Sequence, residues 1–324
     1  MTDINSQKTA LVTGTTSGLG FEAAAQLAEA GYERITITGR STDRAETARA
    51  ELVARTGRDV FDTLALDLGT PKSVQAAAEE LVRRGGKIDF LLLNAGMVGG
   101  NDLVKTDEGI EITHASSLVG HHQLTMHMLE DDLLCKHARI VIAGSEAARG
   151  DVPTFNPIDL AEFAAEHHAD DRVAAADSVM RGAPHVKYKP SNTYANAKLF
   201  VAYWAAELAR KLPTGMTVNA VSPGSAPDTN GDRNAPFFLK RVMMPIFKLV
   251  PGMSAPVSVA AARYLEAADY PEQVTGQFFA SAPKKMTGPL HKVELPHVHD
   301  QASQEATWKA IVAVAGGVDF PVAA

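Results

Sequence analysis

A tyrosine and a lysine lie four residues apart in the segment Tyr194-Ala195-Asn196-Ala197-Lys198. In a helix, residues at this spacing share one face, so the Lys198 ammonium can lie near the Tyr194 hydroxyl. A phenol titrates at about pH 10 and is a poor acid or base at neutral pH, but a nearby cation favours the phenolate. The pair is therefore suited to proton transfer. The same pattern is also common as an ordinary, partly exposed helix pair, so it needs a supporting context.

A glycine-rich segment, residues 13–20 (TGTTSGLG), lies between the first predicted strand and the first predicted helix. Glycines permit a tight turn and let the backbone approach a diphosphate, while the helix start presents free N–H groups and its positive dipole end. A glycine-rich turn alone is a weak signal, but this position favours a nucleotide site. The candidate cofactor-binding residues in it are Gly14, Thr16, Ser17, Gly18, Leu19 and Gly20.

The predicted second strand ends at Gly39 and is followed by Arg40. In dinucleotide folds an acidic residue at this place holds the ribose 2′-hydroxyl, whereas an arginine can pair with a 2′-phosphate. The chain has Arg40 and no acid there, which favours NADP over NAD. The alternative is a solvated surface arginine, because Asp43 is close enough in sequence to compete for it.

Polar residues also follow the next two predicted strands. Asp67, with Leu68 beside it, follows the third strand, and Asn94-Ala95-Gly96 follows the fourth. Ligands bind at the carboxyl edge of a parallel sheet, so both places suit a cofactor. Asp and Asn also favour caps and turns, and the sequence leaves the two interpretations open.

Short β-branched runs alternate with longer segments rich in Ala, Leu and Glu over the first two thirds of the chain. This alternation predicts parallel strands joined by crossover helices. We therefore expect an α/β fold, a doubly wound Rossmann fold with a parallel sheet of about seven strands, formed by one domain over residues 1–324. The expected strands are 9–13, 34–38, 60–66, 88–93, 139–143, 217–221 and 276–280, and the expected helices are 18–30, 72–84, 109–129 and 193–212.

Three segments depart from this alternation. Residues 150–190 separate a strand from the next helix by far more than the roughly 2 to 6 residues of a typical connection, so we expect an insertion with short helices. Residues 225–256 are rich in proline and carry an apolar patch, which is either plain core or a cover over an apolar substrate. Residues 283–324 form a C-terminal extension with a helix pattern at 306–314.

The composition excludes several classes of protein. With 45% apolar and 21% charged residues the chain is ordinary globular material, and it has no apolar run of the roughly 18 residues that a membrane span needs. Its start shows no secretion pattern, so we expect a cytoplasmic protein. The single cysteine, Cys135, excludes an intrachain disulfide. A net charge of −7 argues against a nucleic-acid partner.

Four histidines share one predicted helix: His114, His121, His122 and His127. The spacing offers no further ligand on a second helix, so no metal is expected.

In combination, these motifs resemble the short-chain dehydrogenase/reductase superfamily. The resemblance depends on residues 13–20, Asn94-Ala95-Gly96, a serine after the fifth strand, the Tyr194–Lys198 segment, and Pro223-Gly224 after the sixth strand, and it extends over about residues 8–280. The chain is most similar to the retinol-dehydrogenase-like and protochlorophyllide-reductase-like branch. Members of that branch carry a similar insertion before the tyrosine and a Thr/Ser-Gly-x-Phe/Tyr-Phe stretch, here 275–279.

The resemblance implies a nicotinamide cofactor, for which Arg40 favours NADP(H), and it implies Ser145, Tyr194 and Lys198 as the catalytic residues. Ser145 would hydrogen-bond the substrate oxygen, and Tyr194 would transfer the proton. Lys198 would bind the nicotinamide ribose and lower the pKa of Tyr194, and Pro223 and Gly224 would also contact the cofactor. The insertion would form one wall of the substrate pocket.

Three positions differ from the family pattern. Ser117 stands where relatives usually have an asparagine that kinks the central helix and frees a carbonyl for a proton relay to the lysine. Ser117 could preserve the bend by bonding to its own helix. Gly144 replaces a common second serine, and Thr229 lies one residue beyond the usual threonine.

The expected reaction is the NADP(H)-dependent interconversion of a carbonyl and a secondary alcohol on a small to medium, mainly apolar substrate. One alternative is reduction of an activated C=C bond, with Tyr194 protonating carbon. Another is a cofactor-binding scaffold without turnover, for which Ser117 is the only supporting feature. A homo-oligomer through helices 109–129 and 193–212 is also expected.

Overall fold

The computed structural model describes residues 8–226 and 253–321. Most of the predicted substrate-covering segment 225–256, and with it Thr229, lies outside the described residues. The statements below concern the described part of the chain.

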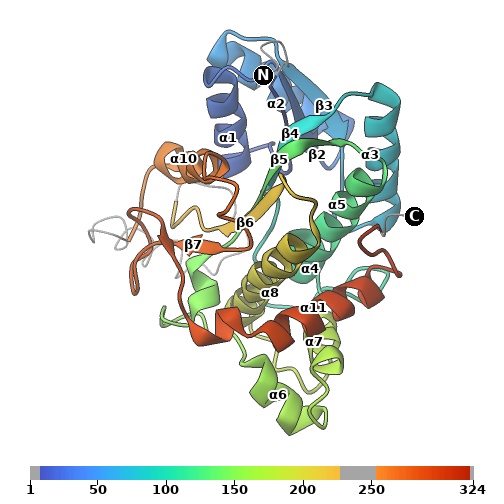
Figure 1. The fold of residues 1–324 in the computed structure, drawn as a ribbon, viewed down its shortest axis with the longest axis vertical. Coiled ribbons are helices and arrows are strands. Elements are labelled where there is room, and N and C mark those ends of the chain that lie inside the picture. Colours follow the sequence, from blue (N-terminus) through green and yellow to red (C-terminus); the bar gives the residue numbers. More distant parts are fainter. Residues whose placement is uncertain (1–7, 227–252, 322–324) are drawn as a thin grey trace.

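An eight-stranded sheet forms the middle layer, in the order β3-β2-β1-β4-β5-β6-β7-β8 (Figure 1). The first seven strands pair in parallel, which confirms the doubly wound Rossmann fold. The strand count exceeds the prediction by one, because the chain returns after β7 and pairs two residues antiparallel to it. The strands are β1 (Thr9–Val12), β2 (Arg34–Gly39), β3 (Phe61–Ala65), β4 (Ile88–Leu93), β5 (Leu134–Ala143), β6 (Thr217–Val221), β7 (Phe278–Ala280) and β8 (His291–Lys292).

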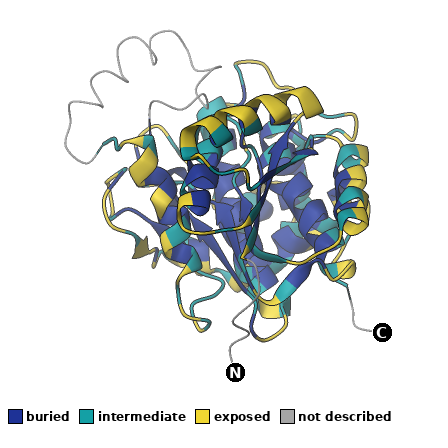
Figure 2. Cartoon of the chain, turned by 90° about the horizontal axis from the view of Figure 1, so that it is seen from above, coloured by how far each residue is buried: buried dark blue, intermediate teal, exposed yellow. Residues whose placement is uncertain are grey.

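Helices cover both faces of the sheet (Figure 1). One face carries α1 (Gly18–Glu29), α2 (Thr42–Thr56) and α10 (Val257–Ala268), and the other carries α3 (Pro71–Arg84), α5 (Gly120–Glu130) and α8 (Pro190–Lys211). Successive strand residues point to opposite faces, so Ala10 and Val12 pack with α1 whereas Leu11 packs on the other side. Burial on both faces explains why the strands are continuous apolar runs. Figure 2 shows the exposed residues on the outer sides of the helices.

Two of these helices, α2 and α10, were not among the predicted elements. The start of α2 is nonetheless marked by Ser41, whose hydroxyl accepts a hydrogen bond from Arg44 N, and its end by Gly57 in the left-handed region. Only Ala45, Ala48 and Leu52 of α2 are buried. This short apolar stripe explains why hydrophobic periodicity did not reveal the helix.

The insertion before α8 and the C-terminal extension form helices of their own. The insertion contains α6 (Leu160–His167) and α7 (Arg172–Arg181), and a 3₁₀ helix, Glu146–Arg149, precedes it. In the extension, α11 (Gln301–Val314) begins earlier than the predicted 306–314 and packs across α7 and α8 (Figure 1). Part of α8 is covered by α11. The homo-oligomer expected through residues 109–129 and 193–212 stays a prediction. Among the described helices, none combines the length and apolar character of a membrane span.

Candidate cofactor and active site

The glycine-rich turn joins β1 to α1 at the carboxyl edge of the sheet. Gly14 and Gly18 have φ angles of 71° and 64°, which favour glycine. A Cβ atom on Gly20 would lie 2.3 Å from the Gly14 carbonyl oxygen and 2.5 Å from Asn94 Nδ2. Ser17, at the N-cap of α1, makes no side-chain capping bond, and the first turn of α1 carries no acid. This helix start therefore keeps N–H groups and a positive dipole end available, which fits the diphosphate of a dinucleotide.

The end of β4 is bonded to this turn. Asn94 Nδ2 donates to the carbonyls of Thr13 (2.9 Å) and Gly14 (3.3 Å), and Ala95 N donates to Thr13 Oγ1 (3.0 Å). Asp67 Oδ1 accepts from Gly69 N at 3.1 Å. Both polar side chains thus have turn-forming contacts. Asn94 in particular fixes the spacing between β1 and β4, where the strand order reverses and dinucleotides bind in this fold class.

His121, which the sequence indicated only as one of four histidines on the central helix, links this region to that helix. His121 Nε2 lies 2.9 Å from Thr13 Oγ1, and its Nδ1 lies 3.2 Å from the Ser117 carbonyl oxygen. Burial lowers the pKa of His121 to about 3, so the ring is neutral. The Ser117 carbonyl can only accept, so Nδ1 carries the proton and Nε2 accepts from Thr13. The four-residue spacing of Ser117 and His121 could have revealed this contact.

Ser117 lies in a π-helical turn, Ala115–Val119, between the short helix α4 (Ile112–His114) and α5. Its hydroxyl is buried and has no hydrogen-bond partner among the described residues. The expectation that Ser117 bonds to its own helix is therefore wrong. Its neighbour Ser116 makes that bond instead, to the Ile112 carbonyl at 2.7 Å. The wide turn itself interrupts the regular helix at this point.

The Ser117 hydroxyl and the ammonium of Lys198 both lie beside Gly96. A Cβ atom on Gly96 would lie 2.9 Å from Ser117 Oγ and 3.7 Å from Lys198 Nζ, so both groups flank Gly96. Lys198 Nζ donates to the Ala143 carbonyl at 2.6 Å. Burial lowers the pKa of Lys198 to about 8.

Lys198 and Tyr194 share one face of α8, as predicted. Lys198 Nζ lies 5.7 Å from the centre of the Tyr194 ring. Tyr194 is half-buried, and its ring centre is 6.0 Å from that of Phe155 in the insertion. Ser145 follows β5 and caps the 3₁₀ helix Glu146–Arg149, with its Oγ accepting from Ala147 N at 3.2 Å. Because α8 packs against this 3₁₀ helix, Ser145 and Tyr194 lie on neighbouring elements.

Arg40 lies at the same edge of the sheet, beside the glycine-rich turn. A Cβ atom on the preceding Gly39 would lie 3.1 Å from Thr16 Cγ2. Arg40 is exposed, and its guanidinium makes no hydrogen bond or ion pair with Asp43 or any other described residue. The competition from Asp43 that the sequence suggested is therefore not observed.

Pro223 and Gly224 follow β6 at this edge. Pro223 is buried, and Gly224 has a φ angle of 81°, in the left-handed region. Gly224 N donates to the Ser222 hydroxyl at 3.1 Å.

Leu68, from the turn after β3, is buried. Its carbonyl oxygen lies so close to Gly120 that a Cβ atom on Gly120 would be 2.2 Å away.

The buried histidines of the central helix bond to protein groups. His114 Nδ1 lies 3.0 Å from Glu111 Oε2. His122 Nδ1 accepts from Trp204 Nε1 at 3.1 Å, and its Nε2 lies 2.7 Å from the Val318 carbonyl oxygen. Over residues 8–226 and 253–321, no three His, Cys, Asp or Glu side chains are grouped so that they could hold a metal ion.

Comparisons with known proteins identify the family. The short chain dehydrogenase model matches residues 8–157. A WW domain-containing oxidoreductase of Drosophila melanogaster is 31% identical over 234 residues, which are 71% of this chain and 52% of the relative. Human retinol dehydrogenase 13 is 26% identical over 87% of this chain and 78% of its own length, and human dehydrogenase/reductase SDR family member 13 is 28% identical over 95% and 73%. The chain belongs to the short-chain dehydrogenase/reductase superfamily and has relatives in its retinol-dehydrogenase-like branch. It spans about half the length of the Drosophila relative.

Solved structures show the same fold. A protein of Mycobacterium Paratuberculosis superposes with a TM-score of 0.68 over 98% of this chain and 96% of its own, at 22% identity. A single-residue variant of the actinorhodin polyketide ketoreductase, solved with NADPH, superposes with a TM-score of 0.59 over 84% and 94%, at 24% identity.

Proposed function

We propose that the protein is an NADP(H)-dependent oxidoreductase that interconverts a carbonyl and a secondary alcohol on a small to medium, mainly apolar substrate. The observation that carries the proposal is the buried Lys198, whose ammonium lies 5.7 Å from the centre of the Tyr194 ring and also beside Gly96, which follows β4. It brings the predicted proton-transfer pair next to the predicted cofactor residues.

The cofactor would lie across the carboxyl ends of β1 and β4. The diphosphate would occupy the start of α1, where residues Gly14 to Gly20 leave N–H groups available. The exposed Arg40 would pair with the 2′-phosphate, and Asp67 and Leu68 would line the adenine end. Asn94, Ala95 and Gly96 would line the middle of the site, Lys198 would donate to the nicotinamide ribose, and Pro223 and Gly224 would flank the ring. When bound, the nicotinamide supplies or accepts the hydride.

Two side chains would contact the substrate oxygen, and a third would act through one of them. Ser145 would donate a hydrogen bond to it, and Tyr194 would donate or accept the proton. At neutral pH Lys198 is mostly protonated because its pKa is about 8. Its charge favours the phenolate of Tyr194, since an opposite charge nearby stabilises the ionised form.

An apolar substrate is supported by the surroundings of Tyr194. Phe155 places an aromatic ring beside the tyrosine. The insertion is held over α8 by two backbone N–H groups: Ile158 N donates to Asn196 Oδ1 (2.9 Å), and Asn156 N donates to Asn192 Oδ1 (3.4 Å). We infer that this segment forms one wall of the substrate pocket. The relatives named retinol dehydrogenase support an apolar alcohol as the substrate class.

The test is a fluorescence titration of the protein with NADPH and with NADH. We expect a preference for NADPH that Arg40→Ala lowers by about 10- to 100-fold, the equivalent of one lost charge-assisted interaction. The matched control is Arg83→Ala, which removes an exposed arginine far from Arg40 in the sequence, on α3. It is expected to leave the affinity for both nucleotides unchanged. Binding of neither nucleotide would contradict the proposal, and equal binding of both would remove the role of Arg40.

A further inference from the structure

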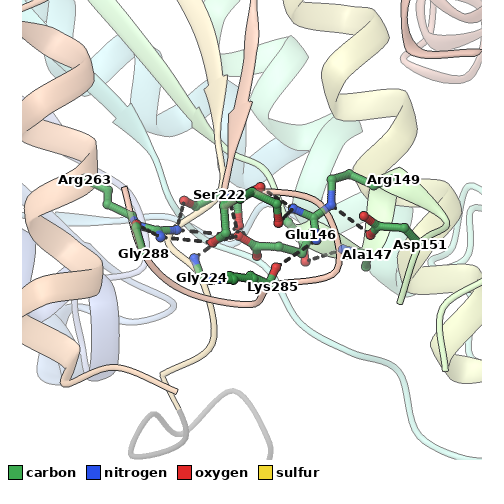
Figure 3. Close-up of polar contacts among 12 residues, drawn as sticks. Glu146, Ala147, Arg149, Asp151, Ser222, Gly224, Arg263, Lys285 and Gly288 are labelled. Carbon is green, nitrogen blue, oxygen red and sulfur yellow. Dashed lines mark hydrogen bonds and ion pairs between the residues drawn. The ribbon is translucent and has the colours of Figure 1, made fainter. Parts of the chain in front are cut away.

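A buried carboxylate follows Ser145 directly in the sequence. Glu146 is 1% exposed and lies in a cluster of polar side chains (Figure 3). Its Oε2 accepts a hydrogen bond from the Ser222 hydroxyl. Its Oε1 accepts from the Ser281 hydroxyl (2.8 Å) and from Ser281 N (3.2 Å). One side chain therefore joins the segments that follow β5, β6 and β7.

A buried guanidinium from α10 completes the cluster. Arg263 is 5% exposed, and its Nη1 lies 3.5 Å from Glu146 Oε1. Nη1 donates to the Ser222 carbonyl at 3.1 Å, while Nη2 donates to Ser281 Oγ at 3.0 Å and to the Gly288 carbonyl. The planar fork of an arginine suits several acceptors at fixed directions. Arg263 thus contacts the same segments as Glu146, from the opposite face of the sheet.

The Pro223-Gly224 turn depends on both charges. The Ser222 hydroxyl donates to Glu146 and accepts from Gly224 N at 3.1 Å, and the Ser222 carbonyl accepts from Arg263. The turn also has no spare room. A Cβ atom on Gly224 would lie 2.7 Å from the Met286 carbonyl oxygen and 2.9 Å from Arg263 Nη1.

Arg149 lies in the same cluster and bonds to Asp151 and to the loop after β7. It pairs with Asp151 at 2.9 Å and donates to the carbonyls of Ser281, Ala282 (3.3 Å) and Lys285 (2.8 Å). These contacts fix the loop after β7, whereas Glu146 bonds to the Ser222 hydroxyl and Arg263 bonds to the Ser222 carbonyl (Figure 3).

Stability alone does not account for a buried pair of this kind. Removing two charges from water is costly, and well-packed apolar residues are often as stable in their place. The pair instead fixes positions, because each of its hydrogen bonds holds one atom of the segments after β6 and β7 in a set direction relative to Ser145. A misplacement of about 1 Å in a reacting group can cost about 100-fold in rate, so fixed directions matter most beside the reacting atoms.

We infer that Glu146 and Arg263 are positioning residues for hydride transfer. They hold the Pro223-Gly224 turn at a fixed place relative to Ser145, and so align the nicotinamide ring with the substrate carbon. This inference rests on the proposed function. It predicts that loss of the pair lowers turnover while leaving the affinity for the cofactor nearly intact, since the phosphates bind elsewhere.

The experiment uses the full chain, with Arg263→Met and Glu146→Gln compared to the wild type. Without ligand, hydrogen exchange of the peptides over 222–226 and 281–288 is expected to rise in both variants. With NADPH and an α,β-unsaturated ketone as the probes, kcat is expected to fall by about 10- to 100-fold. The Kd for NADPH and the KM for the ketone are expected to change by less than about threefold, a shift below 1 kcal/mol. If Arg263→Met does not fold, Arg263→Lys keeps the charge without the fork and is expected to show the same split.

Glu207→Gln is the matched control, because Glu207 is a buried carboxylate paired with Arg210 at the far end of α8. It is expected to leave kcat and the exchange of both peptides unchanged. If the wild type binds NADPH but the variants keep kcat and exchange, the positioning role is overturned and the proposed function stands. A kcat loss with an equal loss of NADPH affinity also overturns it. If the wild type binds no NADPH, the proposed function fails, and the positioning role falls with it.

Discussion

In the part of the chain that forms β1 to β4, hydrogen bonds to backbone groups hold the candidate cofactor residues. In the part that forms β5 to β7, buried charged side chains hold them. In the first half, Asn94 bonds to the carbonyls of Thr13 and Gly14. In the second half, Glu146 and Arg263 connect segments that follow three different strands. The family model matches residues 8–157 and so contains the first half but not Tyr194.

This difference indicates how the two halves divide the task. Small residues and backbone bonds form a cradle whose shape suits the invariant parts of a dinucleotide. In the proposed function, the second half positions one turn and a few side chains around the substrate, and charged side chains supply fixed directions there. If the division is correct, substitutions in one half should affect binding and those in the other should affect turnover.

The largest expected effect is that of Tyr194→Phe, in the half from β5 to β7. Loss of the hydroxyl to which we assign proton transfer should lower kcat by about 10²- to 10⁴-fold. The Kd for NADPH should stay within about threefold, since the phosphates bind elsewhere. Steady-state rates with a ketone and a fluorescence titration measure the two quantities. Tyr270→Phe, which alters a partly exposed tyrosine just after α10, is the control. Unchanged turnover in Tyr194→Phe would remove the assigned proton transfer.

Gly20→Ala should give the opposite pattern. The new Cβ would lie 2.3 Å from the Gly14 carbonyl oxygen, so the turn must shift. We expect the NADPH affinity to fall by at least about tenfold, and the free energy of unfolding to fall by about 1–3 kcal/mol. Titration and denaturant unfolding measure these changes. Gly100→Ala, at a glycine with open space around it, should be neutral. Full affinity in Gly20→Ala would contradict the placement of the diphosphate.

The smallest expected effect concerns Lys198, which lies between the two halves. Its pKa in the folded protein is about 8, below the ordinary 10.5 of lysine. Between these pH values the unfolded chain binds more protons, so this group's contribution to the free energy of unfolding rises with pH. Without ligand, the Tm of the wild type minus the Tm of Lys198→Met should therefore increase as the pH rises through this range. Lys211→Met, on the same helix, should show no such trend. An equal trend in both variants would exclude the buried lysine as its source.

The two halves also differ in how far the sequence predicts them. The glycine-rich turn, Arg40 and the strand ends are local signals, and the structure brings them to one edge as expected. Tyr194 and Lys198 are a local signal too, but only the family resemblance joined them to Ser145. Their roles stay predictions, as do the cytoplasmic location and the choice of NADP.

The features that the sequence did not predict depend on distant contacts. Glu146 and Arg263 are separate charged residues in the sequence, and only the fold places them 3.5 Å apart. Ser117 was expected to bond to its own helix, but Ser116 makes that contact and a π turn forms. Such a turn depends on packing around the whole helix, and no single residue type specifies it.

The most direct test of hydride transfer to a carbonyl uses NADPH deuterated at C4 of the nicotinamide, in both stereochemical forms, with an α,β-unsaturated ketone and the wild-type protein. Mass spectrometry and NMR of the product locate the deuterium. We expect an allylic alcohol that carries deuterium on the former carbonyl carbon from one of the two forms. A saturated ketone with deuterium on the β-carbon would instead show reduction of the C=C bond, and NADPH binding without deuterium transfer to any carbonyl tested would contradict the enzyme and favour a cofactor-binding scaffold.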